Sequence, residues 1–409
     1  MLDPRLINLL DALRRSCPPH RLALPLPVRA IALAPFVLCA ALVFASPGLA
    51  ADPVPDPSLR TFVFKAMTTE AHVVLPTSPS TSAAASGAAS LPSPEEFFDL
   101  AREAVLEVER LMSPRGEDSD VARFNRSAAG EWVPVSPLTL AVLEECARGY
   151  AYSGGGFDPT VGALKGLFSF QGGELDSWPD DAQIQKARQS LGFGEIRTDP
   201  AASAIFKPKD GVLLDLGAAA KGYAVDRALA ALKAAGAENA LVEIGGEVGT
   251  LGITPKGEPW RVRVEDPRAQ GQRLTFELSN SATATSGGRV NYFTYQGKRY
   301  THLIDPRTGT PIPEGTLQTT VAHPDSCLAA DVMSTALFVV GPDGAKGALE
   351  AYARDALSRK SPIEGLEALV FYRDGDGGVR IRIFTVARDG KVTESEGVAE
   401  ALAAAPSAP

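Results

Sequence analysis

The chain has few of the residues that build zinc sites and disulfide frameworks, since its 409 residues include only four cysteines and four histidines. These residues are scattered, and no Cys/His cluster has zinc spacing, so a zinc enzyme is excluded. Positive charge is also scarce. The formal net charge is −9, and it is −12 after the first fifty residues, which hold five arginines and two acids. We therefore expect no nucleic-acid partner and no anionic membrane surface for the folded part.

The two common nucleotide-binding loops are absent from the segment most suited to bind an anion. Val212 to Asp215 is typical of a buried strand, and it turns through Gly217 into a helix start with Lys221 nearby. The segment has neither the Gly-Lys-Ser/Thr order of a Walker loop nor a G-x-G-x-x-G fingerprint. Tight packing of a strand against a helix through small residues is the alternative interpretation. An acidic protein that handles phosphates needs a metal or backbone donors to offset charge repulsion.

The N-terminus has the pattern of a targeting segment. Basic residues precede an apolar stretch from Ala30 to Phe44, and small residues offer cleavage after Ala50 or Ala51. The stretch is shorter than the ~20 residues of a spanning helix. We expect a cleaved signal peptide over residues 1–50 and export to the periplasm; an uncleaved leader, associated with the inner membrane, is the alternative. The general and twin-arginine export routes both remain open, and so does a disulfide between Cys146 and Cys327.

The remainder predicts one large α+β domain with mixed or antiparallel sheets and packed helices. A linker over 51–60 precedes a domain over 61–390, in which 76–94 is a low-complexity loop insertion, and an Ala-rich tail covers 391–409. Helices and strands occur in blocks rather than in strict alternation, which favours α+β over a doubly wound sheet. Apolar periodicity predicts helices at 95–112, 137–153, 184–191 and 218–235, and strands at 61–67, 71–75, 240–244, 260–264, 274–278, 292–295, 316–321, 368–371 and 379–384.

A carboxylate and a hydroxyl stand four residues apart at the head of an apolar run. Asp331 and Thr335 precede a run of apolar residues that ends at Gly341-Pro342, which predicts a helix with both oxygens on one face. Such a pair suits a hard cation such as Mg²⁺, which leaves room for phosphate. The alternative is an aspartate near a helix N-terminus and a threonine bonded to the carbonyl one turn earlier.

Two further segments carry polar residues beside glycines. In Ser153 to Gly162, three consecutive glycines allow close backbone approach to a phosphate, and Asp158 is placed to order their amides. The alternative is a helix C-cap followed by an Asp-Pro turn. In Thr301 to Gly309, His302 precedes a turn at Asp305-Pro306. A lone histidine is by default a buried structural imidazole.

The order of these segments along the chain and their amino-acid sequences resemble those of the ApbE family, the FAD:protein FMN transferases of the bacterial periplasm. The matching stretches run from about residue 61 to about residue 385. They are Met67; Leu111-Met-Ser113 with Ser119-Asp120 and Arg123-Phe-Asn125; Gly155-Gly-Phe-Asp-Pro-Thr-Val-Gly162; Leu214-Asp-Leu-Gly217 with Ala220-Lys-Gly-Tyr-Ala-Val-Asp226; Ile244-Gly-Gly-Glu247; Trp260-Arg-Val with Asp266-Pro267; Thr285-Ser-Gly287; Tyr300-Thr-His-Leu-Ile-Asp-Pro-Arg-Thr-Gly309; and Ala330-Asp331 with Ser334-Thr-Ala336.

The resemblance implies an enzyme that binds FAD and Mg²⁺, attaches FMN through a phosphoester to a Thr or Ser of an acceptor protein, and releases AMP. The metal would be held by Asp331, Thr335 and the backbone carbonyl of Ala218. His302 would assist removal of the acceptor's proton, with Asp305 as the runner-up. The residues implied to contact FAD are Met67, Gly156, Phe157, Asp158, Asp215, Lys221, His302 and Ile304.

The resemblance also implies an acceptor with a D-x-x-[ST]-G-[AS]-T-type motif, such as a redox-pump or electron-transfer subunit. Two other functions stay open from the sequence, namely an Mg²⁺-dependent FAD pyrophosphatase and a non-catalytic periplasmic flavin-binding protein. The chain departs from the family near position 115. Family members often have an aromatic residue there that stacks on the flavin, whereas this chain has Pro114-Arg115. Arg115 could cover a ring face by a cation–π contact.

Overall fold

The computed structural model describes residues 56–78, 91–170, 172–268, 271–288 and 291–396. The predicted signal peptide at 1–50 lies outside these ranges, as do residues 51–55 of the linker, residues 79–90 of the predicted loop insertion and residues 397–409 of the tail. Within the described ranges the predicted α+β class is confirmed. Cys146 and Cys327 are both free and buried, so they form no disulfide with each other.

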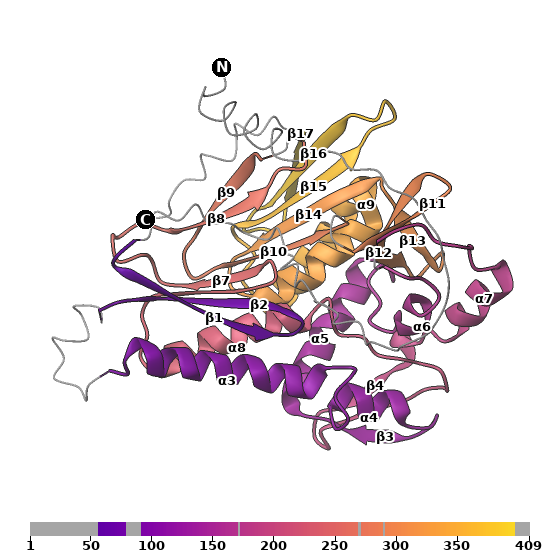
Figure 1. The fold of residues 1–409 in the computed structure, drawn as a ribbon, viewed down its shortest axis with the longest axis horizontal. Helices are drawn as coiled ribbons and strands as arrows, with labels where there is room; N and C mark the ends of the chain where they lie inside the picture. Colours follow the sequence, from indigo (N-terminus) through magenta and orange to yellow (C-terminus); the bar gives the residue numbers. More distant parts are fainter. Residues whose placement is uncertain (1–55, 79–90, 171, 269–270, 289–290, 397–409) are drawn as a thin grey trace, which may run out of the picture. The chain divides into compact units, whose positions relative to one another are not determined.

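A nine-stranded antiparallel sheet forms the centre of the domain (Figure 1). Its strand order is β1-β2-β6-β7-β10-β14-β15-β16-β17, so neighbouring strands follow chain order throughout, and the other elements are inserted between them in the sequence. Alternating residues of β2 explain how the sheet is covered, because Ala71, Val73 and Leu75 are fully buried against the helices. The strands are β1 (Leu59–Ala66), β2 (Thr69–Pro76), β6 (Ala240–Ile244), β7 (Glu247–Leu251), β10 (Ala282–Gly287), β14 (Thr316–His323), β15 (Leu366–Arg373), β16 (Val379–Val386) and β17 (Val392–Glu396).

Four helices lie on one side of this sheet (Figure 1). They are α3 (Pro94–Met112), α5 (Pro137–Tyr152), α8 (Ala220–Ala234) and α9 (Cys327–Arg359). Of these, α3, α8 and α9 contact the strands of the sheet, and α5 packs mainly on α9. The other face is covered by a two-stranded ribbon, β8 (Trp260–Glu265) with β9 (Arg273–Leu278). Its inward side chains, among them Trp260 and Phe276, form a second apolar cluster with Phe371 of β15. The nine-stranded sheet is therefore buried between helices and ribbon.

Two small sheets lie beside this core. One contains β11 (Tyr292–Tyr295), β12 (Lys298–Asp305) and β13 (Thr310–Pro313), and it packs with α6 (Gly162–Lys165) and α7 (Asp181–Gln189) around a third apolar cluster. The other contains β3 (Trp132–Pro134), β4 (Arg197–Asp199) and β5 (Ala204–Phe206), near α4 (Asp120–Arg126). A 3₁₀ turn at Phe193–Glu195 precedes β4.

The helix that carries Asp331 and Thr335 is longer than predicted. The Gly341-Pro342 signal predicted its end, and the chain does leave helical geometry at Gly341, with φ 70° and ψ −177°. A second helical segment begins at once, because Pro342 has the fixed φ that suits a first helical turn. By length and composition α9 could span a membrane, but two thirds of its most apolar window, 67%, is buried inside the domain. It is a core helix.

Element boundaries agree with the sequence wherever the periodicity is strong. The predicted strands at 240–244 and 292–295 match β6 and β11, and the helix at 95–112 matches α3 within one residue. The predicted boundary at residue 390 falls short, because Val392–Glu396 pairs with β16 as an edge strand. Only Val392 of that strand is buried, so it lacks the apolar alternation that would have revealed it.

Candidate functional site

The first turn of α8 faces the carboxylate of Asp331 on α9. Ala219, at the N-cap position of α8, provides no side-chain cap, and the Gly222 amide instead donates to Asp331 Oδ2 at 3.0 Å. Asp331 is almost fully buried, and this burial raises the pKa of its carboxyl, whereas Lys221 and the Gly222 amide oppose the rise. A Cβ on Gly222 would lie 2.4 Å from the Cys327 carbonyl oxygen and 2.8 Å from Asp331 Cβ. Only glycine allows the two helices this close approach.

Thr335 lies one helical turn after Asp331 and faces strand β10. Its Oγ1 is 3.0 Å from Ser286 Oγ, and Ser286 Oγ is also 2.8 Å from Ser334 Oγ. Thr319, the cross-strand partner of Ser286, adds a buried hydroxyl that has no hydrogen-bond partner within the described ranges. The residue that bonds back to its own helix is Ser334, which donates to the Asp331 carbonyl at 3.0 Å. Thr335 therefore belongs to a cluster of hydroxyls beside Asp331.

Lys221 supplies a positive charge next to this carboxylate. Its Nζ is 2.5 Å from Glu247 Oε1, and its side chain is 25% exposed, whereas that of Glu247 is 3% exposed. Burial alone would lower the pKa of Lys221, but Asp331 and Glu247 outweigh it and raise the pKa. Lys221 is thus a firmly charged ammonium that a ligand can still reach.

A second lysine approaches from α6. Lys165 Nζ is 2.7 Å from Asp215 Oδ2, and Asp215 Oδ1 accepts from the Gly217 amide at 2.9 Å. Burial opposes ionisation of Asp215, but Lys165 and the Gly217 amide prevail and lower its pKa. Asn125 fixes the preceding residue, since its side-chain amide both donates to and accepts from the backbone of Leu214. Asp215 is therefore a rigidly placed carboxylate beside the start of α8.

His302 on β12 faces the same group of charges. Its Nδ1 is 3.3 Å from the Asn291 carbonyl oxygen, so that nitrogen carries the proton and Nε2 is left as the acceptor. Burial, followed by the charge of Lys165, lowers the pKa of His302 to about 4, and Lys221 acts in the same direction. The imidazole is neutral at physiological pH, which is the state a proton acceptor needs.

Asp305, the runner-up for the role of base, does not have a free carboxylate. Its Oδ1 accepts from Arg307 Nε at 2.8 Å and its Oδ2 from Arg307 Nη2 at 2.8 Å. Oδ1 also accepts from the Arg307 amide, at 2.9 Å, so the carboxylate fastens the turn between β12 and β13. A carboxylate bound by both prongs of an arginine is held in one fixed geometry. Asp305 is a structural residue.

The glycine-rich turn after α5 has a structural role. The amides of Gly154, Gly155 and Gly156 donate to carbonyls of the last turn of α5 and its cap, and the Phe157 amide donates to Ser153 Oγ. Asp158 is buried, and its Oδ1 accepts from the amide and hydroxyl of Thr160 at 2.7 and 2.5 Å. Asp158 therefore does not order the glycine amides, and the predicted alternative, a helix C-cap with an Asp-Pro turn, is what forms. The segment that follows contacts the site through Pro159, whose carbonyl accepts from the Asp215 amide, and through Val161, which pairs with Leu213.

Met67 lies in the two-residue turn between β1 and β2. Met67 and Thr68 both have positive φ, 52° and 66°, a conformation that costs free energy for residues other than glycine. The Met67 amide donates to Glu109 Oε1 of α3 at 2.9 Å, which helps to hold the turn. The turn adjoins the β6–β7 turn, since a Cβ on Gly245 would meet Thr69 Cγ2 at 2.9 Å. Ile304 is buried in the third apolar cluster.

The oxygen donors around Asp331 suit a magnesium ion. Gly222, four residues after Ala218, gives its amide hydrogen to Asp331 rather than to the Ala218 carbonyl. Asp331, Thr335 and Ala218 would together offer a carboxylate, a hydroxyl and a carbonyl, all hard oxygen ligands. No group of three or more His, Cys, Asp or Glu side chains with metal-binding arrangement occurs in the part of the chain that the structure describes. The donor set thus fits an ion that keeps several waters and disfavours zinc or copper.

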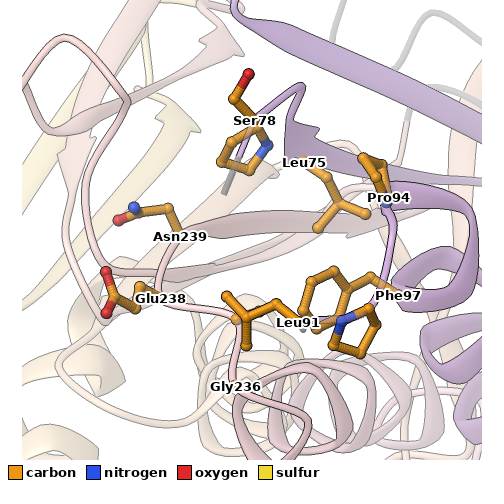
Figure 2. A pocket seen from close by; sticks show the side chains of 11 residues that line it. Leu75, Ser78, Leu91, Pro94, Phe97, Gly236, Glu238 and Asn239 are labelled. Carbon is orange, nitrogen blue, oxygen red and sulfur yellow. The ribbon is translucent and has the colours of Figure 1, made fainter. Parts of the chain in front are cut away.

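Two hollows lie apart from these residues. One, of about 50 Å³, lies between the end of β2, the start of α3 and the α8–β6 turn, and Leu75, Phe97 and Asn239 line it (Figure 2). It is too small for a dinucleotide, because even pockets for small-molecule ligands measure roughly 300–1,000 Å³. The other, of about 360 Å³, is an open hollow lined by Trp178, Tyr295, Gln296, Lys298 and Tyr300. Of its lining residues, Lys298 and Tyr300 belong to β12, the strand that also carries His302.

Three residues that the structure places beside the predicted site residues were missed from the sequence. Lys165 has no motif around it, and only folding brings it to Asp215, fifty residues away. Glu247 and Ser286 belong to segments that resemble the family, Ile244-Gly-Gly-Glu247 and Thr285-Ser-Gly287, but the sequence indicated no role for either residue. A buried carboxylate after a tight Gly-Gly turn was the available signal for Glu247.

Fold and site together describe an α+β protein in which the start of α8 meets Asp331 of α9 beside a cluster of hydroxyls, and in which Lys221 acts on the neutral imidazole of His302. Comparison with known proteins identifies the family. The ApbE family model matches residues 67–357, and the chain belongs to the ApbE family.

Named relatives and solved structures agree with this membership. The chain is 36% identical over 249 residues to the FAD:protein FMN transferase of Vibrio cholerae serotype O1, covering 60% of this chain and 73% of that protein. It is 35% identical over 252 residues to the FAD:protein FMN transferase of Haemophilus influenzae, covering 59% and 72%. The structure of the flavin transferase ApbE from Vibrio cholerae matches with a TM-score of 0.65 at 27% identity, covering 81% of this chain and 97% of that chain. The flavinyl transferase ApbE of Pseudomonas stutzeri, in its apo form, matches with a TM-score of 0.65 at 30% identity, covering 79% and 94%.

Proposed function

We propose that this protein is a magnesium-dependent FAD:protein FMN transferase. It would move FMN from FAD to a Thr or Ser hydroxyl of an acceptor protein, form a phosphoester and release AMP. The observation that carries the proposal is that the charge of Lys221 acts on both Asp331 and the neutral imidazole of His302, while Thr335 lies one helical turn after Asp331. Relatives named FAD:protein FMN transferase support the same reaction.

The chain's residues would divide the work as phosphoryl transfer requires. Asp331, Thr335 and the Ala218 carbonyl would hold Mg²⁺, which when bound neutralises charge on the diphosphate. Lys221 is partly exposed and would orient a phosphate oxygen of FAD. His302 Nε2 would accept the proton of the acceptor hydroxyl as its oxygen bonds to the FMN phosphorus, and the bond to the AMP phosphate breaks. AMP leaves with the electron pair of that bond.

Two further properties are part of the proposal. Export to the periplasm would bring the enzyme to acceptor proteins outside the cytoplasm, as the basic and apolar leader over 1–50 suggests. The acceptor would carry a D-x-x-[ST]-G-[AS]-T-type motif on an exposed loop, because its hydroxyl must reach His302. The Arg115 guanidinium replaces the aromatic residue common in the family and would cover a flavin face by a cation–π contact.

The test uses the chain from Ala51 onward with FAD, Mg²⁺ and an acceptor domain that carries the motif. We expect the acceptor to gain the mass of FMN less one water, and AMP to appear in equal amount, as measured by intact-mass spectrometry and chromatography. An acceptor with valine in place of the motif's hydroxyl residue is the matched control and should gain no mass. AMP release without any gain in acceptor mass would identify a pyrophosphatase, and flavin binding without AMP would identify a binding protein.

A further inference from the structure

Glu247 is a buried carboxylate to which the proposed reaction gives no role. It is the first residue of β7 and follows a tight turn in which Gly245 and Gly246 both have positive φ, 61° and 106°. Its side chain faces the helices, as does Gly249 on the same side of the strand, where a Cβ would meet Val225 Cγ1 of α8 at 2.7 Å. The turn and the strand therefore hold Glu247 firmly beneath the start of α8.

The two oxygens of Glu247 have different surroundings. Oε1 lies 2.5 Å from Lys221 Nζ, whereas Oε2 is buried and has no hydrogen-bond partner among the residues that the structure describes. An unsatisfied buried carboxylate oxygen costs free energy, so a residue of this kind needs a compensating interaction. Lys221 is the partner that the carboxylate has in the described part of the protein.

Asp331 competes with Glu247 for the ammonium group of Lys221. Its charge acts on both Lys221 and Glu247, so two buried carboxylates share one ammonium. Lys221 precedes Gly222, whose amide already binds Asp331 Oδ2, so the lysine stem starts next to that carboxylate. A lysine side chain has four rotatable methylenes, and without Glu247 it would turn to the nearest remaining anion. That anion is Asp331.

We propose that Glu247 is a positioning residue that holds the Lys221 ammonium away from Asp331, so that the Asp331 carboxylate stays available for a divalent cation. The inference rests on the proposed function, because it takes Asp331 as the ligand of the ion. It assigns to Glu247 a role in cation affinity without direct contact with the ion. It also explains why Lys221, which lies beside the Asp331 carboxylate, is paired with the Glu247 carboxylate.

The experiment measures cation binding rather than turnover, with Mn²⁺ as the probe in the full chain without FAD. Free Mn²⁺ is followed by electron paramagnetic resonance at pH 8.5 under argon, where Glu247 is ionised, since burial raises the pKa of its carboxyl to about 8. We expect Glu247→Gln to weaken Mn²⁺ binding about tenfold, because the uncharged amide no longer keeps the ammonium from Asp331. The double variant Glu247→Gln with Lys221→Gln should recover binding to within about threefold of wild type, because the competing ammonium is gone.

Two matched variants complete the test. Glu243→Gln changes an acid on the same hairpin that pairs with His72, and it should leave Mn²⁺ binding unchanged. Glu247→Asp keeps the charge but shortens its reach, so it should weaken binding about threefold; it also carries the test if the Gln variant does not fold.

Equal Mn²⁺ affinity in wild type and in the Glu247 variants would overturn the inference and leave the proposed function intact. A double variant no better than Glu247→Gln alone would also overturn it, since the loss would then not arise from competition by Lys221. Wild-type protein that binds no Mn²⁺ would overturn both the inference and the cation site of the proposed function.

Discussion

Replacing Asp331 with asparagine is expected to lower the rate of FMN transfer by about a thousandfold or more. The substitution keeps an oxygen that accepts from the Gly222 amide, so α8 stays capped and the fold persists. It removes the only carboxylate of the proposed cation site, and loss of metal-based charge stabilisation costs several kcal/mol of transition-state free energy. About 4 kcal/mol corresponds to a factor of about a thousand in rate. Transfer rates at saturating FAD and Mg²⁺ measure the effect.

The matched control for this variant is Asp343→Asn on the same helix. The Asp343 side chain is 91% exposed and pairs with Arg382 at the surface, so its loss should change the rate less than about twofold. Thermal unfolding of both variants should lie within a few degrees of wild type. If Asp331→Asn keeps full activity while remaining folded, Asp331 does not hold the ion.

Replacing His302 with glutamine is expected to lower the transfer rate by about 10²–10⁴-fold. Glutamine retains hydrogen bonding but accepts no proton from the acceptor hydroxyl, so the general-base contribution is lost. FAD affinity should fall far less, because the effect lies in the chemical step. Stopped-time mass spectrometry of the acceptor and flavin-fluorescence titration separate the two quantities.

If His302 is the base, the pH dependence of kcat/KM in the wild type should report the pKa of its imidazole. Because burial and Lys165 lower the pKa of His302 to about 4, kcat/KM should stay level down to about pH 5 and fall only below it. An ordinary histidine would give a midpoint near 6.5. Lys165→Met should move the acid midpoint upward. An unchanged profile in that variant would show that Lys165 does not act on the base.

The lowered pKa of His302 also makes the folded protein more stable at neutral pH than at acidic pH. The unfolded chain binds a proton at His302 near pH 6.5, whereas the folded protein does so only near pH 4. Stabilisation from the neutral imidazole is therefore complete above about pH 6.5 and is lost as the pH falls toward 4. In His302→Gln the free energy of unfolding should decline less over that window.

The sequence predicted those parts of the site whose residues lie within a few positions of one another. Asp331 and Thr335 lie one helical turn apart, so the helix alone places both on one face, and the packing of α9 adds only their partners. The helices 95–112 and 137–153 and the central strands follow from apolar periodicity in the same way. The cap of α8 was not predictable, because the carboxylate that accepts from the Gly222 amide belongs to a residue 109 positions later.

Charge pairs between distant segments account for the remaining differences. Lys221 and Glu247 are 26 positions apart, and neither residue's neighbours indicate that a buried ion pair will form. Asp305 looked like a free acid in the sequence, but Arg307 two residues later occupies both of its oxygens. The glycines at 154–156 looked like a phosphate cradle, but the uncapped carbonyls of α5 take up their amides. In each case a local motif fits two structures, and the surrounding packing decides between them.

The most direct test of the account is the position of a divalent cation in crystals grown with Mn²⁺ and FAD. Anomalous diffraction should place one Mn²⁺ within bonding distance of an Asp331 carboxylate oxygen, the Thr335 hydroxyl and the Ala218 carbonyl, with the diphosphate on its open side. A cation bound elsewhere, with Asp331 directed away from the diphosphate, would contradict the account.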